Sequence, residues 1–176
     1  NGRRPFPLAL DDYFVDREQT PRDARGEYDY ETIRALDLGL FGEHLRSLVG
    51  GRPTSLPRYN FLTGLREAGP TVTLDSEHVI IVEGIHGLNP VLAKSLPPEA
   101  VFRVYVSALT QLNLDRHNRV ATSDCRLLRR IVRDAATRGY NAAATLKRWD
   151  SVVRGEKQHI FGFQENADAV FNSALV

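Results

Sequence analysis

The chain has 176 residues, of which 42% are hydrophobic and 26% charged, and this fits one globular α/β domain over residues 1–176. A formal net charge of +1 gives no whole-protein argument for binding nucleic acid or an anionic membrane. The single cysteine, Cys125, excludes an intrachain disulfide and a cysteine-rich zinc site, and it fits a reducing cytoplasm. No apolar run is long enough to cross a bilayer, and no secretory signal opens the chain.

The first half of the chain predicts a strand, a helix and a hairpin. Residues 5–10 read as a strand, and the polar stretch 15–28 reads as a loop. Apolar residues at helical spacing predict a helix over 31–49, which a pair of glycines closes. The stretch 52–76 contains prolines, glycines and short β-like pieces. We expect it to form a hairpin-like excursion that covers a site.

The second half of the chain alternates predicted strands and helices. Strands are predicted over 78–82, 101–106 and 169–172, and helices over 124–137 and 141–153. Strands that alternate with helices indicate a parallel α/β sheet.

Two apolar runs stop abruptly at a carboxylate, residues 8–10 at Asp11 and residues 79–82 at Glu83. Short apolar runs are typical of strands buried in a parallel sheet, where ligands bind beyond the carboxyl ends. If the two strands are neighbours, both carboxylates project into one crevice. Such a pair suits a Mg²⁺ site plus a base for a hydroxyl nucleophile. The alternative is that acids end the strands only for solubility.

The predicted helix at 124–139 carries arginines on one face and apolar residues on the other. Four arginines fall within an arc of about 100° at helical spacing; they are Arg126, Arg129, Arg130 and Arg133. We expect the opposite face to be buried; it holds Leu127, Leu128, Ile131, Val132 and Ala135. Only Asp134 supplies an acid, so the arginine face favours an anion, either a nucleoside triphosphate or a nucleic-acid backbone. The near-neutral net charge favours the small anion, and a solvated helix face is the alternative.

Taken in order, these segments resemble the uridine kinase/phosphoribulokinase family of P-loop kinases, and more closely a bacterial uridine kinase-like branch. The resemblance covers essentially the whole chain and rests on LDDYF (10–14), EYDYE (27–31), PRYNF (57–61), VIIVEGIHGL (79–88), FRVYVSALTQLN (102–113), RLLRRIVRDAATRG (126–139) and ADAVFNSAL (167–175). It implies a parallel-sheet P-loop kinase-like α/β fold with helices on both faces. It also implies transfer of the γ-phosphoryl group of ATP, with Mg²⁺, to a hydroxyl of a nucleoside such as uridine or cytidine, or of a sugar phosphate.

The resemblance assigns roles to individual residues. Asp11 matches the residue that orients and deprotonates the acceptor hydroxyl, and Glu83 matches the acid that holds Mg²⁺, with Asp11 as a second candidate ligand. Asp29 matches a residue that binds sugar hydroxyls, and Tyr59 and Phe61 match an aromatic pair that lines the acceptor pocket. The alternatives are a helix N-cap for Asp29 and core packing for the aromatic pair.

The resemblance also implies positions for other residues around that pocket. Tyr13 lies beside the aromatic pair. The helix over 124–139 becomes a lid whose four arginines close over the phosphates of ATP. We expect His86 to have a structural role.

The chain also departs from the family pattern. It contains no G-x-x-x-x-G-K-[ST] loop, so these residues alone should bind ATP poorly and should not turn over. Gly64 stands where nucleoside kinases of the family have a histidine, and Asn60 stands where the family often has Asp. These two differences argue against assigning uridine itself as the acceptor.

In the family, the P-loop strand lies between the strands that match 78–82 and 101–106. We expect these two strands not to pair directly here, and the intact protein to supply the missing strand upstream. The chain starts at Asn1 and contains no methionine, which predicts a piece of a longer protein fused to further domains.

The expected partners are ATP and a small acceptor, with no membrane and no nucleic acid, and the expected location is the cytoplasm. The sequence leaves open whether the chain forms a homo-oligomer. The alternative functions are a nucleotide- or RNA-binding module and an inactive regulatory domain.

Overall fold

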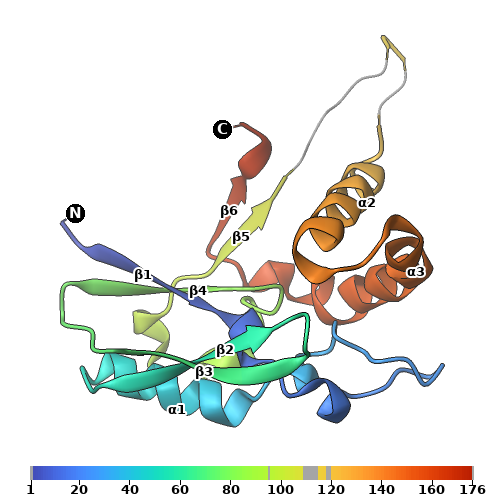
Figure 1. The fold of residues 1–176 in the computed structure, drawn as a ribbon. Helices are drawn as coiled ribbons and strands as arrows, with labels where there is room; N and C mark the ends of the chain where they lie inside the picture. Colours follow the sequence, from blue (N-terminus) through green and yellow to red (C-terminus); the bar gives the residue numbers. More distant parts are fainter. Residues whose placement is uncertain (1, 95, 109–114, 118–119, 176) are drawn as a thin grey trace.

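The computed structural model describes residues 2–94, 96–108, 115–117 and 120–175 (Figure 1). Within these residues the strands form three two-stranded sheets. β1 (Arg4–Ala9) pairs in parallel with β4 (His78–Glu83). This arrangement confirms two of the predicted strands and makes them neighbours.

The other two pairs differ in direction. β5 (Val104–Ser107) pairs in parallel with β6 (Ala169–Asn172), at the positions predicted for the last two strands. β2 (Thr54–Asn60) and β3 (Leu65–Val72) form an antiparallel hairpin, which confirms the predicted excursion over 52–76.

β4 and β5 do not pair with each other in the described part of the chain. Apolar side chains on both strands stay exposed, with Val79 and Ile81 43% and 49% exposed on β4, and Val104 and Val106 44% and 58% exposed on β5. They border a hollow of about 1700 Å³ that is also lined by helix α2 (Thr122–Arg133). The expected separation of these two strands is therefore present.

Helix α1 spans Leu38–Val49, and it begins later than the predicted start at residue 31. Asp37 is its N-cap, because its carboxylate accepts a hydrogen bond from the backbone N–H of Leu40 at 3.0 Å. The residues before Asp37 form a short 3₁₀ turn over Ile33–Ala35 instead. Local capping therefore splits the predicted helix in two.

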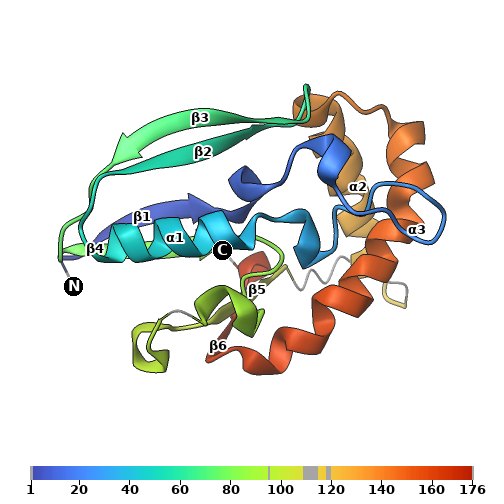
Figure 2. The ribbon, with the colours of Figure 1, turned by 90° about the horizontal axis from the view of Figure 1, so that it is seen from below.

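The apolar side of α1 packs against β2 and the turn after β1, and Figure 2 shows the helix running alongside β1. Side chains from these elements and from the loops around them form one buried cluster. It consists of Leu8, Leu10, Tyr13, Phe14, Ala35, Leu36, Phe41, Leu45, Leu48, Leu56, Tyr59, Leu74 and Leu92.

Helices α2 (Thr122–Arg133) and α3 (Ala142–His159) pack on each other beyond the carboxyl end of β1 (Figure 2). A π-helical turn, Asp134–Arg138, continues α2 and ends at Gly139, whose φ of +70° suits glycine. Both predicted helices are confirmed, and α3 is longer than predicted. Of the helices in the described ranges, none has the length and apolar character needed to cross a membrane.

The prediction that the apolar face of α2 is buried is wrong. Leu128 is 61% exposed and Val132 is 69% exposed, and both face the hollow beside β4 and β5. The reason is physical: an amphipathic helix buries its apolar stripe only where another element covers it, and no described residue fills this hollow.

Helix α3 approaches the segment before α1 very closely at Gly155. A Cβ placed on Gly155 would lie 2.3 Å from the Cβ of Glu31. Glycine is therefore required for this contact, and it fixes α3 against the 27–31 segment.

This contact gives a stability prediction. Gly155→Ala should lower the free energy of unfolding by about 1–3 kcal/mol, because the methyl group overpacks the contact with Glu31. In the control Gly42→Ala, on α1, the new Cβ meets only the Arg46 guanidinium at 3.9 Å. That variant should gain about 0.5–1 kcal/mol from helix propensity. Urea unfolding curves measure both, and a Gly155→Ala variant as stable as Gly42→Ala would contradict the prediction.

Candidate active site

The two strand-ending carboxylates leave the same edge of the β1–β4 pair. The strands are parallel, with Ala9 opposite Glu83, and Asp11 lies in the turn directly after β1. Gly84 packs against the side chain of Leu10, since a Cβ on Gly84 would lie 2.8 Å from the Leu10 Cβ. The residue after Glu83 thus contacts the residue before Asp11, at the edge where ligands bind in open α/β sheets.

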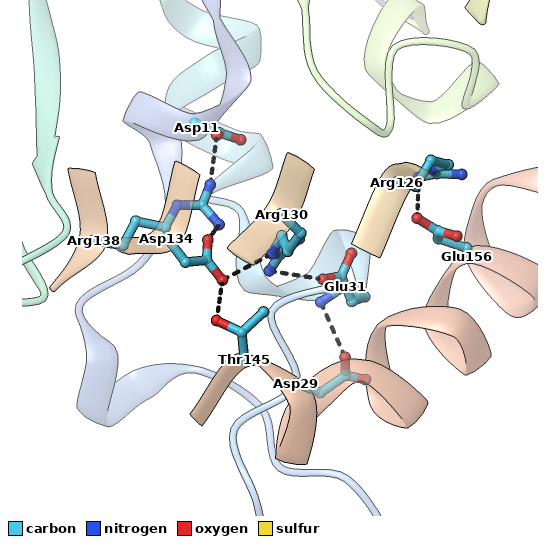
Figure 3. A network of polar contacts seen from close by, with 9 residues as sticks. All are labelled: Asp11, Asp29, Glu31, Arg126, Arg130, Asp134, Arg138, Thr145 and Glu156. Carbon is cyan, nitrogen blue, oxygen red and sulfur yellow. Dashed lines mark hydrogen bonds and ion pairs between the residues drawn. The ribbon is translucent and has the colours of Figure 1, made fainter. Parts of the chain in front are cut away.

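Asp11 lies beside Arg138, at the end of the π-helical turn that continues α2 (Figure 3). Its Oδ2 is 3.8 Å from Nη2 of Arg138. Burial raises the pKa of the Asp11 carboxyl above its ordinary value, while the positive charges of Arg138 and Arg133 partly offset this effect. Asp11 therefore combines a reduced tendency to ionise with cations that stabilise its charged form.

Glu83 is exposed and lines the hollow between β4 and β5. No group of three or more His, Cys, Asp or Glu side chains that could hold a metal occurs within the described ranges. Mg²⁺ commonly takes only one or two carboxylates and completes its shell with water and substrate phosphates. Asp11 and Glu83 supply two carboxylates at one strand edge, and their joint role as Mg²⁺ ligands stays a prediction.

The aromatic residues divide into core and site. Tyr13 is fully buried, and its hydroxyl lies 3.2 Å from Nδ1 of His44, so the predicted place of Tyr13 beside an acceptor pocket is wrong. Its ring contributes to the core instead, edge-on to Phe41 at 5.2 Å between centroids. Tyr59 is also buried, in agreement with the core alternative.

Phe61 borders the site. Its ring lies 5.1 Å from that of Tyr59, and the Arg138 guanidinium stacks over it at 4.8 Å from the ring centroid. Since the same guanidinium reaches Asp11, Phe61 and Asp11 face one region.

Asp29 caps a turn and does not begin a helix. Its Oδ1 accepts a hydrogen bond from the backbone N–H of Glu31 at 3.0 Å. Its assignment to sugar hydroxyls stays a prediction.

The four arginines of α2 do not form an acid-free face. Arg126 pairs with Glu156 of α3, and Arg130 lies 3.8 Å from Glu31 and 3.2 Å from Asp134 (Figure 3). The sequence pattern missed these partners because Glu31 and Glu156 are distant along the chain.

The other two arginines of the helix differ. Arg129 and Arg133 border the hollow, and neither forms an ion pair with any residue that the structure describes. These two retain their charge for an external anion.

Arg138 was not among the predicted site residues, yet it contacts three of the groups described here. It reaches Asp11, stacks on Phe61 and lies 3.5 Å from Asp134. The available signal was its i,i+4 spacing from Asp134 in the last turn before a glycine. Arg138 lies outside the arginine stripe of α2, so the stripe does not indicate it.

His86 follows Glu83 by three residues and is 3% exposed. Neither ring nitrogen has a hydrogen-bond partner among the described residues. Burial, with a smaller contribution from His159, lowers the pKa of His86 to about 4. The ring is therefore neutral in the folded protein at neutral pH.

The split among the arginines gives a second stability prediction. Arg126→Ala and Arg130→Ala should each cost about 1–3 kcal/mol of unfolding free energy, because each leaves a buried glutamate without its cation. The matched variants Arg129→Ala and Arg133→Ala should stay within about 0.5 kcal/mol of the parent. Chemical denaturation measures the four variants, and equal losses in both pairs would contradict the assignment.

The neutral state of His86 predicts a pH effect. Between pH 6.5 and about 4 the unfolded chain binds a proton on His86 that the folded chain does not, so acid lowers stability in this window. His86→Leu should remove this loss, which reaches about 3 kcal/mol near pH 4 at 1.36 kcal/mol per pKa unit. Unfolding free energies of parent and variant between pH 7 and 4 measure the difference, and parallel curves would contradict it.

The comparisons with known proteins agree with this arrangement. The fold is a mixed α/β fold of the P-loop kinase type: a structure described as a possible uridine kinase from Bacillus stearothermophilus superposes with a TM-score of 0.53 at 17% sequence identity, and the match covers 97% of this chain and 73% of that chain. The profile of the Phosphoribulokinase / Uridine kinase family matches residues 8–175, and the chain belongs to this family.

Curated relatives give the same family. Uridine kinases of Staphylococcus aureus strains JH9 and Newman are each 31% identical over 148 residues. The matches cover 84% of this chain and 63% of each relative, so the chain spans less than two thirds of the length of these proteins.

Proposed function

We propose that the intact protein transfers the γ-phosphoryl group of ATP to a hydroxyl of a small ribose-containing acceptor, a nucleoside or a sugar phosphate. The observation that carries the proposal is the meeting of Asp11, Arg138 and Phe61 at the strand edge that also ends in Glu83. Family membership supports the kinase class.

In this proposal Asp11 orients the acceptor hydroxyl and accepts its proton. A carboxylate is adequate because the transition state of phosphoryl transfer is loose and the proton leaves late, so positioning contributes more than basicity. Asp11 and Glu83 would hold Mg²⁺, which, when bound, neutralises charge on the phosphates.

The unpaired arginines supply the phosphate side. Arg129 and Arg133 would contact the triphosphate, where guanidinium groups match phosphate oxygens. Arg126 and Arg130 are already held by acids of the chain, so we assign them to lid structure rather than to ATP. Of the four arginines of α2, two then have no ion-pair partner among the described residues and remain for an anion, and this short stretch of positive charge weakens the alternative of an RNA-binding module.

The acceptor side has one feature that bears on specificity. Arg17 fills the space beside Gly64, since a Cβ on Gly64 would lie 2.6 Å from the Arg17 guanidinium carbon. Arg17 also donates a hydrogen bond to the Phe61 carbonyl at 2.9 Å. A histidine side chain at position 64 would collide with this guanidinium, so an acceptor pocket here differs from that of nucleoside kinases with histidine. Asp29 and Phe61 remain the candidates for binding the acceptor.

We also propose that a P-loop strand and its helix occupy the hollow between β4 and β5 in the intact protein. The free edges of both strands and the exposed apolar face of α2 support this placement. Phosphotransfer is therefore to be tested with the intact protein.

The test combines an acceptor screen with one variant. ADP release by the intact protein is measured against nucleosides and ribose phosphates, and Asp11→Asn is then assayed with the best acceptor. We expect kcat to fall by about 10²–10⁴-fold, the range for loss of a general base, with little change in the Kd for ATP.

Asp12→Asn is the matched control. The Asp12 Oδ1 accepts a hydrogen bond from the Tyr59 backbone N–H at 3.1 Å, and the Asn oxygen can accept it too. This variant should keep most of the activity. Equal loss of turnover in both variants, or equal loss of ATP binding and turnover in Asp11→Asn, would contradict the role of Asp11.

A further inference from the structure

Asp134 is a buried acid at the junction of α2 and α3, with an exposure of 4%. Its carboxylate lies 3.2 Å from Nε of Arg130 and 3.5 Å from Nη1 of Arg138, and it accepts a hydrogen bond from the Thr145 hydroxyl at 3.2 Å. An isolated buried carboxylate is costly, and these two cations offset the cost of burying Asp134. Because both arginines are four residues away, they share one side of the helix.

The contacts continue on both sides of Asp134. Arg138 extends to Asp11, and Arg130 extends to Glu31, each at 3.8 Å. Figure 3 shows the resulting row of alternating charges, which we call the carboxylate–arginine relay: Asp11, Arg138, Asp134, Arg130 and Glu31.

The relay joins two parts of the candidate site. At one end is Asp11, the proposed base. At the other end is Glu31, whose backbone N–H donates a hydrogen bond to Oδ1 of Asp29. The Cβ of Glu31 packs against Gly155 of α3. The lid thus contacts the 27–31 segment, which is assigned to acceptor binding. It also contacts Asp11, which is assigned to accept the proton of the acceptor hydroxyl.

Arg138 is constrained from two directions. The Phe61 ring lies against its guanidinium, and Asp134 holds one of its terminal nitrogens. Without Asp134, the attraction of Asp11 and the Phe61 ring would remain, but the guanidinium would lose its anchor on the lid. Arg138 is the residue that contacts both carboxylates, so the effect of Asp134 on Asp11 passes through Arg138.

We propose that Asp134 is a positioning residue, which fixes Arg138 over Asp11 and, through Arg130 and Glu31, makes lid closure and ordering of the acceptor segment one event. This inference rests on the proposed phosphotransfer, in which Asp11 meets the acceptor hydroxyl. It also gives a role to Asp134, the one acid among the arginines of this helix in the sequence.

The kinetic test uses the intact protein with ATP and its best acceptor. Asp134→Asn should lower kcat by about 10- to 100-fold, the scale of a small misplacement of a catalytic group, with a smaller change in the KM for the acceptor. Arg138→Gln should lower kcat at least as much. The losses should be less than additive in the double variant, because the effect of Asp134 on Asp11 passes through Arg138.

Glu156→Gln is the matched control. Glu156 is as buried as Glu31, at 7% against 8% exposure, and it also pairs with a lid arginine, but that arginine is Arg126, outside the relay. The proposal is overturned if Glu156→Gln lowers kcat as much as Asp134→Asn does. It is also overturned if the losses in Asp134→Asn and Arg138→Gln are additive.

Hydrogen exchange of the protein without ATP tests the relay independently of turnover. Asp134→Asn and Glu31→Gln should each raise exchange in both 27–31 and 134–138, whereas Glu156→Gln should leave 134–138 protected. Increased exchange in only one of the two segments overturns the coupling. If the intact protein transfers no phosphoryl group to any acceptor, the proposed function fails, while this exchange pattern still decides whether the relay exists.

Discussion

The burial of acidic side chains around α2 and the π-helical turn after it is the constraint on which the site depends. Glu31, Asp134 and Glu156 are each less than 10% exposed. A charge in such a place requires a counter-charge, and among the described residues the counter-charges are arginines of α2 and of this turn. The position of α2 relative to the strand edge therefore follows from charge pairing as much as from apolar packing. This explains how a helix with an exposed apolar face can have a defined place.

The same constraint divides residues that look equivalent in the sequence. Four arginines lie on one stripe of α2, but within the described part of the chain two have acidic partners and two do not. The number of arginines along a helix therefore overstates the number of arginines that can bind a ligand. The residue that reaches the proposed base, Arg138, lies outside the stripe and takes its place from the π-helical turn and the glycine after it.

Much of the framework could be predicted from local pattern, because short apolar runs that end in a carboxylate indicate strands of a parallel sheet. β1, β4 and their shared edge followed from such runs. The start of α1 did not, because the cap at Asp37 competes with the apolar periodicity that begins at residue 31. The burial of Tyr13 and the pairing of Glu31 with Arg130 also escaped prediction. Both depend on contacts between segments far apart in the chain, and no local pattern records these.

The open edges of β4 and β5 have a practical consequence for the isolated polypeptide. Backbone N–H and C=O groups on such edges, flanked by exposed valine and isoleucine side chains, are a template for pairing with other chains. At high concentration the chain should therefore self-associate edge to edge, and its colloidal behaviour would then reflect these two strands more than its modest net charge.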